Sequence, residues 1–210
     1  MKKIAIIGSG HLGQQITHHI QTDTQDKVVA FFDDYQEKGS SILNIPILGG
    51  NSDIYNAFSE NIFDELIIAI GYKHMNIRAQ IFEKFSTQIP FYNFIHSSVI
   101  LDKTTKLGQG SIIYPGCVID QYVNIGNNVL LNISCSIAHD STIGNHSFIS
   151  PSVAIAGFVN IGEQSIIGIN STIIDNIYIS PKTQLGAGTV VIKNIESHGL
   201  YVGNPAKFIR

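Results

Sequence analysis

The sequence predicts a two-domain protein, in which an α/β domain of residues 1–94 precedes an all-β domain of residues 95–210 built as a parallel β-helix. Three observations predict this class: a six-residue repeat in the second half, a glycine-rich turn between a strand and a helix in the first, and a charged fraction of only 14%. A helix-rich soluble protein needs more Lys and Glu on its solvated faces, whereas backbone, Asn, Ser and Thr can cover much of a repetitive β surface.

The repeat places an aliphatic residue at every sixth position from residue 95 to residue 191, with no gap and no polar substitution. Four residues after each one, from residue 105 to residue 171, the position is small or β-branched. Neither a helical period nor the alternation of a strand explains a strict period of six. We therefore expect the aliphatic residues to point into a prism and to stack along its axis. The series is Ile95, Leu101, Leu107, Ile113, Ile119, Ile125, Leu131, Ile137, Ile143, Ile149, Ile155, Ile161, Ile167, Ile173, Ile179, Leu185 and Val191.

A second period of eighteen residues appears in four aliphatic-glycine pairs, at 107–108, 125–126, 143–144 and 161–162. Eighteen residues are three hexads, so each coil should have three faces and a triangular section, with between five and six coils in all. We expect these glycines to relieve crowding at the corners, where positive φ angles are favoured. Cys117 and Cys135 are also eighteen residues apart, which predicts buried neighbours on adjacent coils rather than a disulfide.

The first ninety residues read as a short Rossmann-like fold. A buried strand at 3–8 leads into Gly8-Ser9-Gly10-His11-Leu12-Gly13, which fits G-x-G-x-x-G and opens a helix. A second strand at 28–32 ends in Asp33-Asp34, twenty residues after the last glycine, and is followed by a third strand at 63–71, a helix at 75–85 and a fourth strand at 91–94. The glycine-rich turn indicates a phosphate or nucleotide ligand. The domain is only half of a full dinucleotide fold, which argues against NAD as that ligand. Two structural alternatives stay open: a turn that merely packs a helix on a strand, and a solvated strand end at Asp33-Asp34.

Charge, hydropathy and cysteine content exclude several classes. The net charge of −3 gives no support for nucleic-acid binding, and no apolar stretch approaches the length of a membrane span. The apolar run before Gly8 is too short for a signal-peptide core, and two cysteines suit a reduced compartment. We expect a cytoplasmic protein without membrane insertion, and no metal-binding cluster is visible.

The hexad series resembles the hexapeptide-repeat acyltransferases, whose defining fold is a left-handed parallel β-helix. The resemblance covers the whole second half and implies a homotrimer that binds acetyl-CoA in grooves between subunits. Residues 203–207, Gly-Asn-Pro-Ala-Lys, are similar to the sequence that closes many of these helices beside the cofactor. Fused to a Rossmann-like domain, the repeat resembles the bacterial sugar O- and N-acyltransferases of the sialic-acid O-acetyltransferase and UDP-bacillosamine N-acetyltransferase type.

This resemblance implies substrate contacts in the first domain. The turn Ser9-Gly10-His11 matches the family's substrate loop, Asp33 and Asp34 match the acidic pair that contacts base and ribose, and Gly71 matches a third contact. Carboxylates can accept hydrogen bonds from a pyrimidine N–H and from ribose hydroxyls. The substrate implied is a nucleotide-linked amino sugar.

Acetyl transfer requires removal of a proton from the attacking amine or hydroxyl, and a neutral imidazole suits this role. His139 is expected two residues past an inward aliphatic, near a corner and facing outward. His139 and Asp140 match the family's catalytic pair, which implies a His general base supported by the carboxylate. Neighbouring side chains on a regular strand point to opposite faces, so the two can meet only if the backbone bends.

The resemblance also implies a cofactor groove at Phe148, Gly157, Ile169, Ala187 and Gly188. The family often has a histidine near the acetyl group at the position of Phe148, whereas His146 lies two residues earlier here. Which of these two residues contacts the acetyl group stays open.

The function predicted is direct transfer of an acetyl group from acetyl-CoA to the amine of a nucleotide-linked amino sugar, with a UDP-4-amino sugar as first candidate, for bacterial surface glycan synthesis. Cys117 and Cys135 point inward, so no residue is expected to carry the acyl group covalently. One alternative is O-acetylation of a sugar hydroxyl, for example on a sialic acid. A second is a non-catalytic nucleotide-sugar scaffold on an inert helix.

Overall fold

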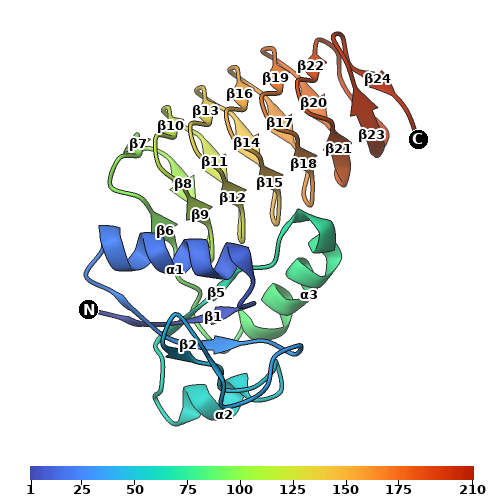
Figure 1. The fold of residues 1–210 in the computed structure, drawn as a ribbon. Helices are drawn as coiled ribbons and strands as arrows, with labels where there is room; N and C mark the ends of the chain where they lie inside the picture. The colour runs from blue at the N-terminus through green and yellow to red at the C-terminus, as the bar shows by residue number, and fades with distance from the viewer. The chain divides into compact units, whose positions relative to one another are not determined.

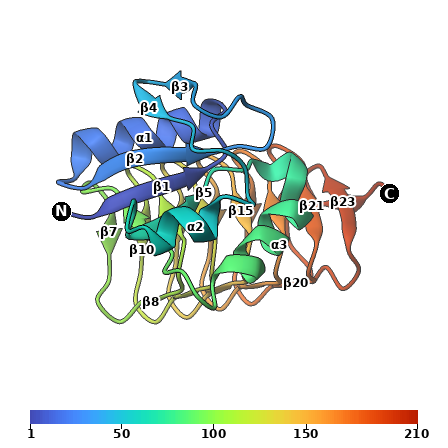
Figure 2. The ribbon, with the colours of Figure 1, turned by 90° about the horizontal axis from the view of Figure 1, so that it is seen from below.

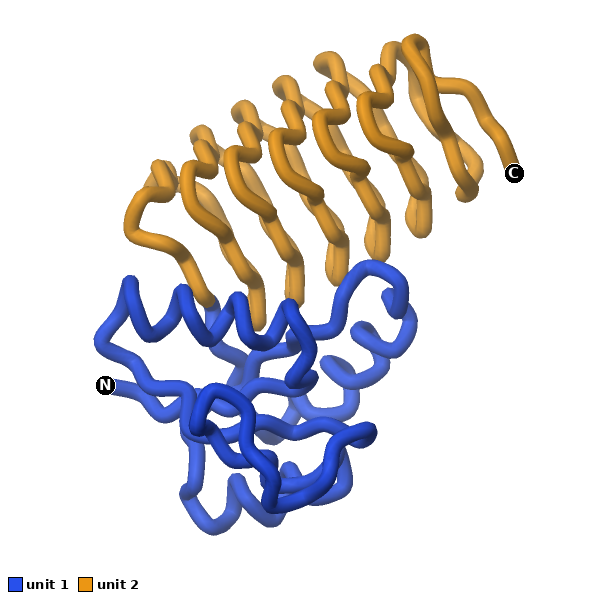
Figure 3. The backbone as a smooth tube through the Cα atoms, viewed as in Figure 1, with its two compact units in different colours: residues 1–93 blue, residues 94–210 orange.

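The computed structural model describes all 210 residues and divides into two compact units, Met1–Asn93 and Phe94–Arg210 (Figure 3). No helix in it has the length and apolar character needed to cross a membrane.

A three-stranded parallel sheet forms the centre of the first unit, with strand order β2-β1-β5. Its apolar strands are buried on both faces, as parallel strands require. Helix α1 covers one face, while α2 and α3 cover the other (Figures 1 and 2). The elements are β1 (Lys3–Ile7), α1 (His11–Asp23), β2 (Lys27–Phe32), β3 (Ser41–Ile42), β4 (Ile45–Pro46), α2 (Ile54–Ser59), β5 (Glu65–Ile68), the 3-10 helix η1 (Tyr72–His74) and α3 (Met75–Phe85).

The prediction of a fourth strand at 91–94 is wrong. Phe91 makes a single bridge to Leu66, flanked by hydrogen bonds from Leu66 N to Pro90 O and from Tyr92 N to Leu66 O. A proline has no N–H to donate, so the pairing does not extend backwards from Phe91. The chain then leaves the sheet, and Phe94 already belongs to the second unit.

The second unit is a left-handed parallel β-helix of about six turns, seen as stacked coils in Figure 1. Its strands form three faces, named here after their first strands. The β6 face holds β6 (Phe94–Ile95), β9 (Ile112–Ile113), β12 (Leu130–Leu131), β15 (Phe148–Ile149), β18 (Ile166–Ile167), β21 (Thr183–Leu185), β23 (Gly199–Val202) and β24 (Lys207–Phe208). The β7 face holds β7 (Ile100–Leu101), β10 (Val118–Ile119), β13 (Ser136–Ile137), β16 (Ala154–Ile155), β19 (Thr172–Ile173) and β22 (Val190–Val191). The β8 face holds β8 (Lys106–Leu107), β11 (Asn124–Ile125), β14 (Thr142–Ile143), β17 (Asn160–Ile161) and β20 (Tyr178–Ile179).

Each coil pairs with the next in a register of eighteen residues, for example Ile119 with Ile137 and Ile137 with Ile155. The second residue of each short strand points inward, so the predicted aliphatic series forms the core. The β-helix predicted from the repeat is therefore confirmed, with the left hand that the family resemblance implies. Cys117 and Cys135 are free and buried, and their thiols donate to the carbonyls of Asn132 at 3.0 Å and Ser150 at 3.2 Å.

The corners differ from the expectation in one respect. From Gly110 to Lys182, the residue three positions after an inward aliphatic adopts a positive φ at every corner, and most of these residues are not glycine. The glycines that directly follow the aliphatics do not have positive φ angles. They are needed for space, because a Cβ on Gly126 would lie 2.5 Å from Oδ1 of Asn145 in the next coil.

The last strands change direction. β23 runs parallel to β21, and β24 then returns antiparallel to β23. The same segment bonds to the β7 face, where Val190 N donates to Gly203 O at 3.0 Å and Ala206 N donates to Val190 O at 2.8 Å. On the β8 face, Ile195 forms a bridge with Ile179.

Candidate active site

A pocket of about 550 Å³ opens in the first unit at the carboxyl ends of β1, β2 and β5. The chain builds β2 on one side of β1 and β5 on the other, so the strand order reverses at β1. In open parallel sheets, ligands bind at the carboxyl ends of the strands beside such a reversal. The lining residues are Ile7, Gly8, Phe32, Asp33, Asp34, Tyr35, Asn51, Ala69, Ile70, Gly71, His74, Ile77 and Ile81.

The glycine-rich turn has the geometry that its motif predicts. Gly8 has φ +97°, and a Cβ on Gly13 would lie only 2.2 Å from the carbonyl oxygen of Gly8, so α1 can approach β1 only with glycine there. Gly10 is the N-cap residue of α1, and a Cβ on it would meet no atom within 4 Å. The turn therefore leaves the N-terminus of α1 open on the side of Gly10, where backbone N–H groups can bind an anion.

Asp33 joins this turn to the end of β2. Its Oδ2 accepts hydrogen bonds from the N–H of Ser9 at 2.9 Å and the hydroxyl of Ser9 at 2.7 Å, and its Oδ1 accepts from the N–H of Tyr35 at 3.0 Å. Partial burial pushes the pKa of Asp33 upward, but these hydrogen bonds outweigh burial and leave its pKa below the ordinary value. Asp33 is therefore ionised and well anchored at neutral pH.

Asp34 is held by Asn51. Its Oδ1 accepts from the N–H of Asn51 at 2.8 Å, and its Oδ2 accepts from the side-chain Nδ2 at 2.5 Å. Gly50 makes room for this contact, since a Cβ there would lie 2.1 Å from Oδ1 of Asp34. Because Asp34 remains exposed, its carboxylate can accept further hydrogen bonds from a ligand.

The pocket thus brings together three of the predicted substrate residues, Asp33, Asp34 and Gly71. Ser9 reaches it through its bonds to Asp33, whereas Gly10 and His11 lie at the start of α1 and do not line it. Sequence reasoning missed three lining residues whose side chains carry polar groups, Tyr35, Asn51 and His74. Tyr35 directly follows the acidic pair and Asn51 follows two glycines, and these neighbours were the signals available for them.

In the second unit, His139 and Asp140 lie on the corner between the β7 face and the β8 face. Asp140 has φ +58°, which bends the backbone so that the two neighbouring side chains meet. His139 Nδ1 lies 2.9 Å from Asp140 Oδ2, and the two side chains are 41% and 39% exposed. A carboxylate partner favours the proton on Nδ1, which leaves Nε2 unprotonated as an acceptor.

The ring of His139 is packed against the next coil. A Cβ on Gly157 would lie 2.8 Å from its Cε1 and 3.0 Å from its Nε2, so only glycine leaves room for the imidazole. The ring of Phe158 meets it edge to face, with centroids 5.2 Å apart and an angle of 87° between the planes. The imidazole is therefore confined between the carboxylate, the glycine and the phenyl ring.

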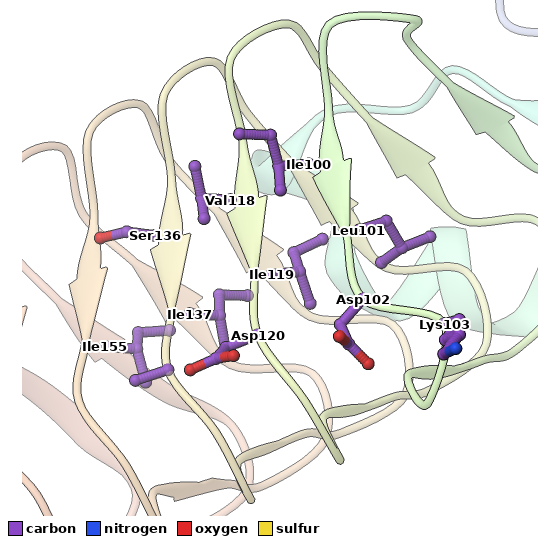
Figure 4. Close-up of a pocket in the computed structure, with 11 residues that line it drawn as sticks. Ile100, Leu101, Asp102, Lys103, Val118, Ile119, Asp120, Ser136, Ile137 and Ile155 are labelled. Carbon is purple, nitrogen blue, oxygen red and sulfur yellow. The ribbon is translucent and has the colours of Figure 1, made fainter.

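A groove of about 630 Å³ crosses the first coils of the β7 face and reaches Ala138, the residue before His139. Figure 4 shows Ile100, Val118 and Ser136 in one row across its strands, with Asp102 and Asp120 in another. Ile100 and Val118 are exposed although apolar, so this part of the surface is suited to contact with another molecule.

The predicted cofactor residues lie on different parts of the prism. Gly157 is on the corner with His139, whereas Ile169, Ala187 and Gly188 stack on the corner between the β6 and β7 faces, where Gly188 N donates to Ile169 O at 2.8 Å. The width of the β7 face separates these two corners. Within one chain, the five predicted residues therefore do not form a single groove, and the fifth, Phe148, starts β15 on the β6 face.

His146 lies on the corner between the β8 and β6 faces, where its Nδ1 is 3.1 Å from Asn128 Nδ2. Within one chain, neither His146 nor Phe148 shares the corner of His139. The thiols do not provide a nucleophile either, since Cys117 and Cys135 are both fully buried in the core of the β-helix. No group of three or more His, Cys, Asp or Glu side chains is arranged to hold a metal ion.

A β-helix of hexads with an exposed His–Asp pair on one corner, preceded by an α/β domain with a nucleotide-type pocket, defines the class of hexapeptide-repeat transferases. Comparison with family models agrees with this assignment to a class for both parts of the chain. Residues 3–85 match the PglD N-terminal domain, and residues 122–157 match the bacterial transferase hexapeptide (six repeats). A comparison with curated protein sequences gives no match.

Solved structures resemble the whole chain. The acetyltransferase domain of PglB from Neisseria gonorrhoeae FA1090 is 25% identical with a TM-score of 0.91, and 100% of each chain is covered. A structure of that domain in complex with acetyl coenzyme A is 26% identical with a TM-score of 0.90 over 99% of each chain. PerB from Caulobacter crescentus, in complex with CoA and GDP-perosamine, is 24% identical with a TM-score of 0.89 over 100% of this chain and 98% of PerB, a likeness that shows the shared fold. The resemblance to the hexapeptide-repeat sugar acyltransferases is thus confirmed, and the chain is an acyltransferase.

Proposed function

We propose that the protein transfers the acetyl group of acetyl-CoA to the amine of a nucleotide-linked 4-amino sugar, with a UDP-linked sugar as the first candidate. The observation that carries this proposal is the corner pair His139–Asp140, in which the carboxylate engages Nδ1 and leaves Nε2 open. The whole-chain likeness to an acetyltransferase domain whose structure holds acetyl coenzyme A supports the choice of donor.

The chemistry follows from the pair. Nε2 of His139 takes a proton from the amine as the nitrogen attacks the thioester carbonyl carbon. The new C–N bond forms and the C–S bond breaks, and the proton taken up by His139 passes to the departing sulfur, so that CoA leaves as its thiol. Asp140 orients the imidazole and stabilises its protonated form. Because both thiols lie in the core, the acetyl group passes directly to the amine.

The pocket of the first unit supports a nucleotide as the part of the substrate through which the sugar is bound. Its carboxylates are acceptors for ribose hydroxyls and for a base N–H, and the N-terminus of α1 suits a pyrophosphate. Tyr35 adds an aromatic ring that lines the pocket and is 95% exposed. An exposed ring at the pocket suits a nucleobase, because every base has a π face on which an aromatic side chain can stack.

A homotrimer belongs to the proposal, because the predicted cofactor residues occupy two corners of one prism. A second copy whose corner between the β6 and β7 faces approaches His139 would bring Ile169, Ala187 and Gly188 to the same groove as Gly157. The exposed apolar side chains of the β7 face are suited to such an interface.

The deciding experiment incubates the purified protein with acetyl-CoA and a panel of UDP-, dTDP- and GDP-linked 4-amino sugars, together with free sialic acid. We expect mass spectrometry to find an acetylated UDP-4-amino sugar and release of one thiol per product. Acetylation of sialic acid alone would favour the O-acetyltransferase alternative. Light scattering should give a trimer, and a lasting monomer of 23.0 kDa at micromolar concentration would contradict the shared groove.

A further inference from the structure

We propose that Phe158 is a positioning residue for His139, and that its ring holds the imidazole in the orientation that acetyl transfer requires. The inference rests on the proposed role of His139 as general base. Phe158 and Tyr122 both carry a large aromatic side chain at a left-handed corner of the β-helix, and the Phe158 ring is the one that meets His139.

Phe158 occupies a left-handed corner, with φ +58°. For a bulky side chain such an angle is an outlier, and Asn or Gly accept it far more readily. The chain uses Asn176 at the equivalent place one coil later, also with a positive φ. Phe158 is also 55% exposed, so it gains little from burial in the corner. Neither backbone preference nor core packing of this coil explains a phenylalanine there.

The contact with His139 does explain it. The Phe158 ring stands at 87° to the imidazole with centroids 5.2 Å apart, and the N–H of Phe158 donates to the carbonyl of His139 at 3.1 Å. Oδ2 of Asp140 lies 2.9 Å from Nδ1 of His139, and the missing side chain of Gly157 leaves the space that the imidazole fills. These contacts limit rotation of the imidazole about both side-chain bonds.

Without the phenyl ring, one wall of this arrangement is missing. The His139 side chain is 41% exposed, so water alone would occupy the vacated side and the imidazole could rotate. Rotation breaks the bond to Asp140 and turns Nε2 away from the attacking amine. Because proton transfer depends on this alignment, the loss should appear in kcat rather than in ligand affinity.

The test is Phe158→Asn, with Tyr122→Asn as the matched control. Tyr122 holds the equivalent corner two coils earlier, with φ +57° and 57% exposure, and makes no ring contact with His139. Asn suits both corners, so both variants should unfold at or above the temperature of the wild type. We expect Phe158→Asn to lower kcat by roughly tenfold or more, while the Kd values for CoA and UDP stay unchanged. The control Tyr122→Asn should keep the kcat of the wild type. Phe158→Tyr, which retains an aromatic ring, should have most of the wild-type activity.

A second readout does not depend on turnover. Nitrogen-15 NMR of the His139 ring should show one tautomer with the proton on Nδ1 in the wild type and a mixture in Phe158→Asn. Full kcat in Phe158→Asn, or an unchanged tautomer signature, would overturn the proposal. If the wild type acetylates no sugar at all, the proposed function fails, while the NMR comparison still decides whether Phe158 orders His139.

Discussion

The two units of the molecule hold their polar groups in different ways. In the first unit, Asp33 and Asp34 are fixed by hydrogen bonds from Ser9, Tyr35 and Asn51, all within one folded unit. In the β-helix, the backbone N–H and C=O groups bond to coils eighteen residues away, and the reactive side chains stand exposed on corners. A pocket built inside one unit can bind its ligand alone, whereas a corner that faces solvent needs another surface to complete it. Substitutions in the pocket should therefore change the Kd of the nucleotide, whereas substitutions at the corner should change kcat.

The largest expected effect is a loss of kcat without a change in nucleotide affinity. His139→Ala should lower kcat by roughly 10²- to 10⁴-fold, the usual cost of losing a general base, with the Kd for UDP unchanged in calorimetry. The side chain is exposed, so its truncation opens no core cavity and the unfolding temperature should hold. Asp140→Asn should cost less, because the base itself remains.

The pH dependence of His139→Ala sharpens the choice of acceptor. For an amine, the defect should shrink as pH rises, since more of the substrate is already deprotonated. A hydroxyl acceptor would show no recovery below about pH 9, because its own pKa lies near that of water. Wild-type activity in His139→Ala would remove the proposed base altogether.

A smaller effect is expected when the nucleotide pocket is changed. Tyr35→Ala should weaken UDP binding by about 5- to 150-fold, the equivalent of about 1–3 kcal/mol of base stacking, with the Kd for CoA unchanged. Because the chain has no tryptophan, Tyr35→Trp introduces a single tryptophan, whose emission UDP should quench. Leu43→Trp, at another exposed position of the first unit, serves as the control and should not respond. Tight UDP binding by Tyr35→Ala would show that the ring has no part in the site.

The smallest effect concerns the stability of the first unit. Since the pKa of folded Asp33 lies below the unfolded value of about 3.9, its ionised form stabilises the fold above that pH, and this contribution is lost as pH falls through the lower, folded pKa. Asp33→Asn should therefore unfold at a lower temperature than the wild type at pH 7, and the difference should close as the solution is acidified below about pH 4. Glu60→Gln, a change to an exposed carboxylate, should match the wild type throughout. A difference that stays constant down to pH 3 would rule out this role for the Asp33 charge.

The β-helix core could be predicted residue by residue because each inward position repeats the environment of its neighbours. The same period also sets the left-handed corners, but the prediction placed their positive φ angles at the glycines that directly follow the aliphatics. Their residues include Tyr122, Ser134, Phe158 and Lys182, which have no common preference for positive φ. Stacking of the coils imposes the angle there, and local propensity does not reveal it.

In the first unit, prediction succeeded where a pattern is local. The helix at 75–85 has the predicted bounds, because its apolar period is carried by its own residues. The β3–β4 hairpin escaped notice, since its turn places Leu43 at φ 53° and Asn44 at φ 60°, and leucine is no signal for such a turn. The clamp of Asp34 by Asn51 joins segments seventeen residues apart and has no sequence signature, so only the folded chain reveals it.

The reversal at β24 has a consequence for the solubility of the molecule. A stack of parallel coils ends in a row of unpaired backbone groups, which would template the addition of further strands from other molecules. Residues 195–208 cover that row on all three faces, with an antiparallel strand over the β6 face, bonds to Val190 on the β7 face and a bridge to Ile179 on the β8 face. Parallel addition of a further coil is therefore blocked at this end of the stack, where the two-residue strand β24 is the edge that remains on the β6 face.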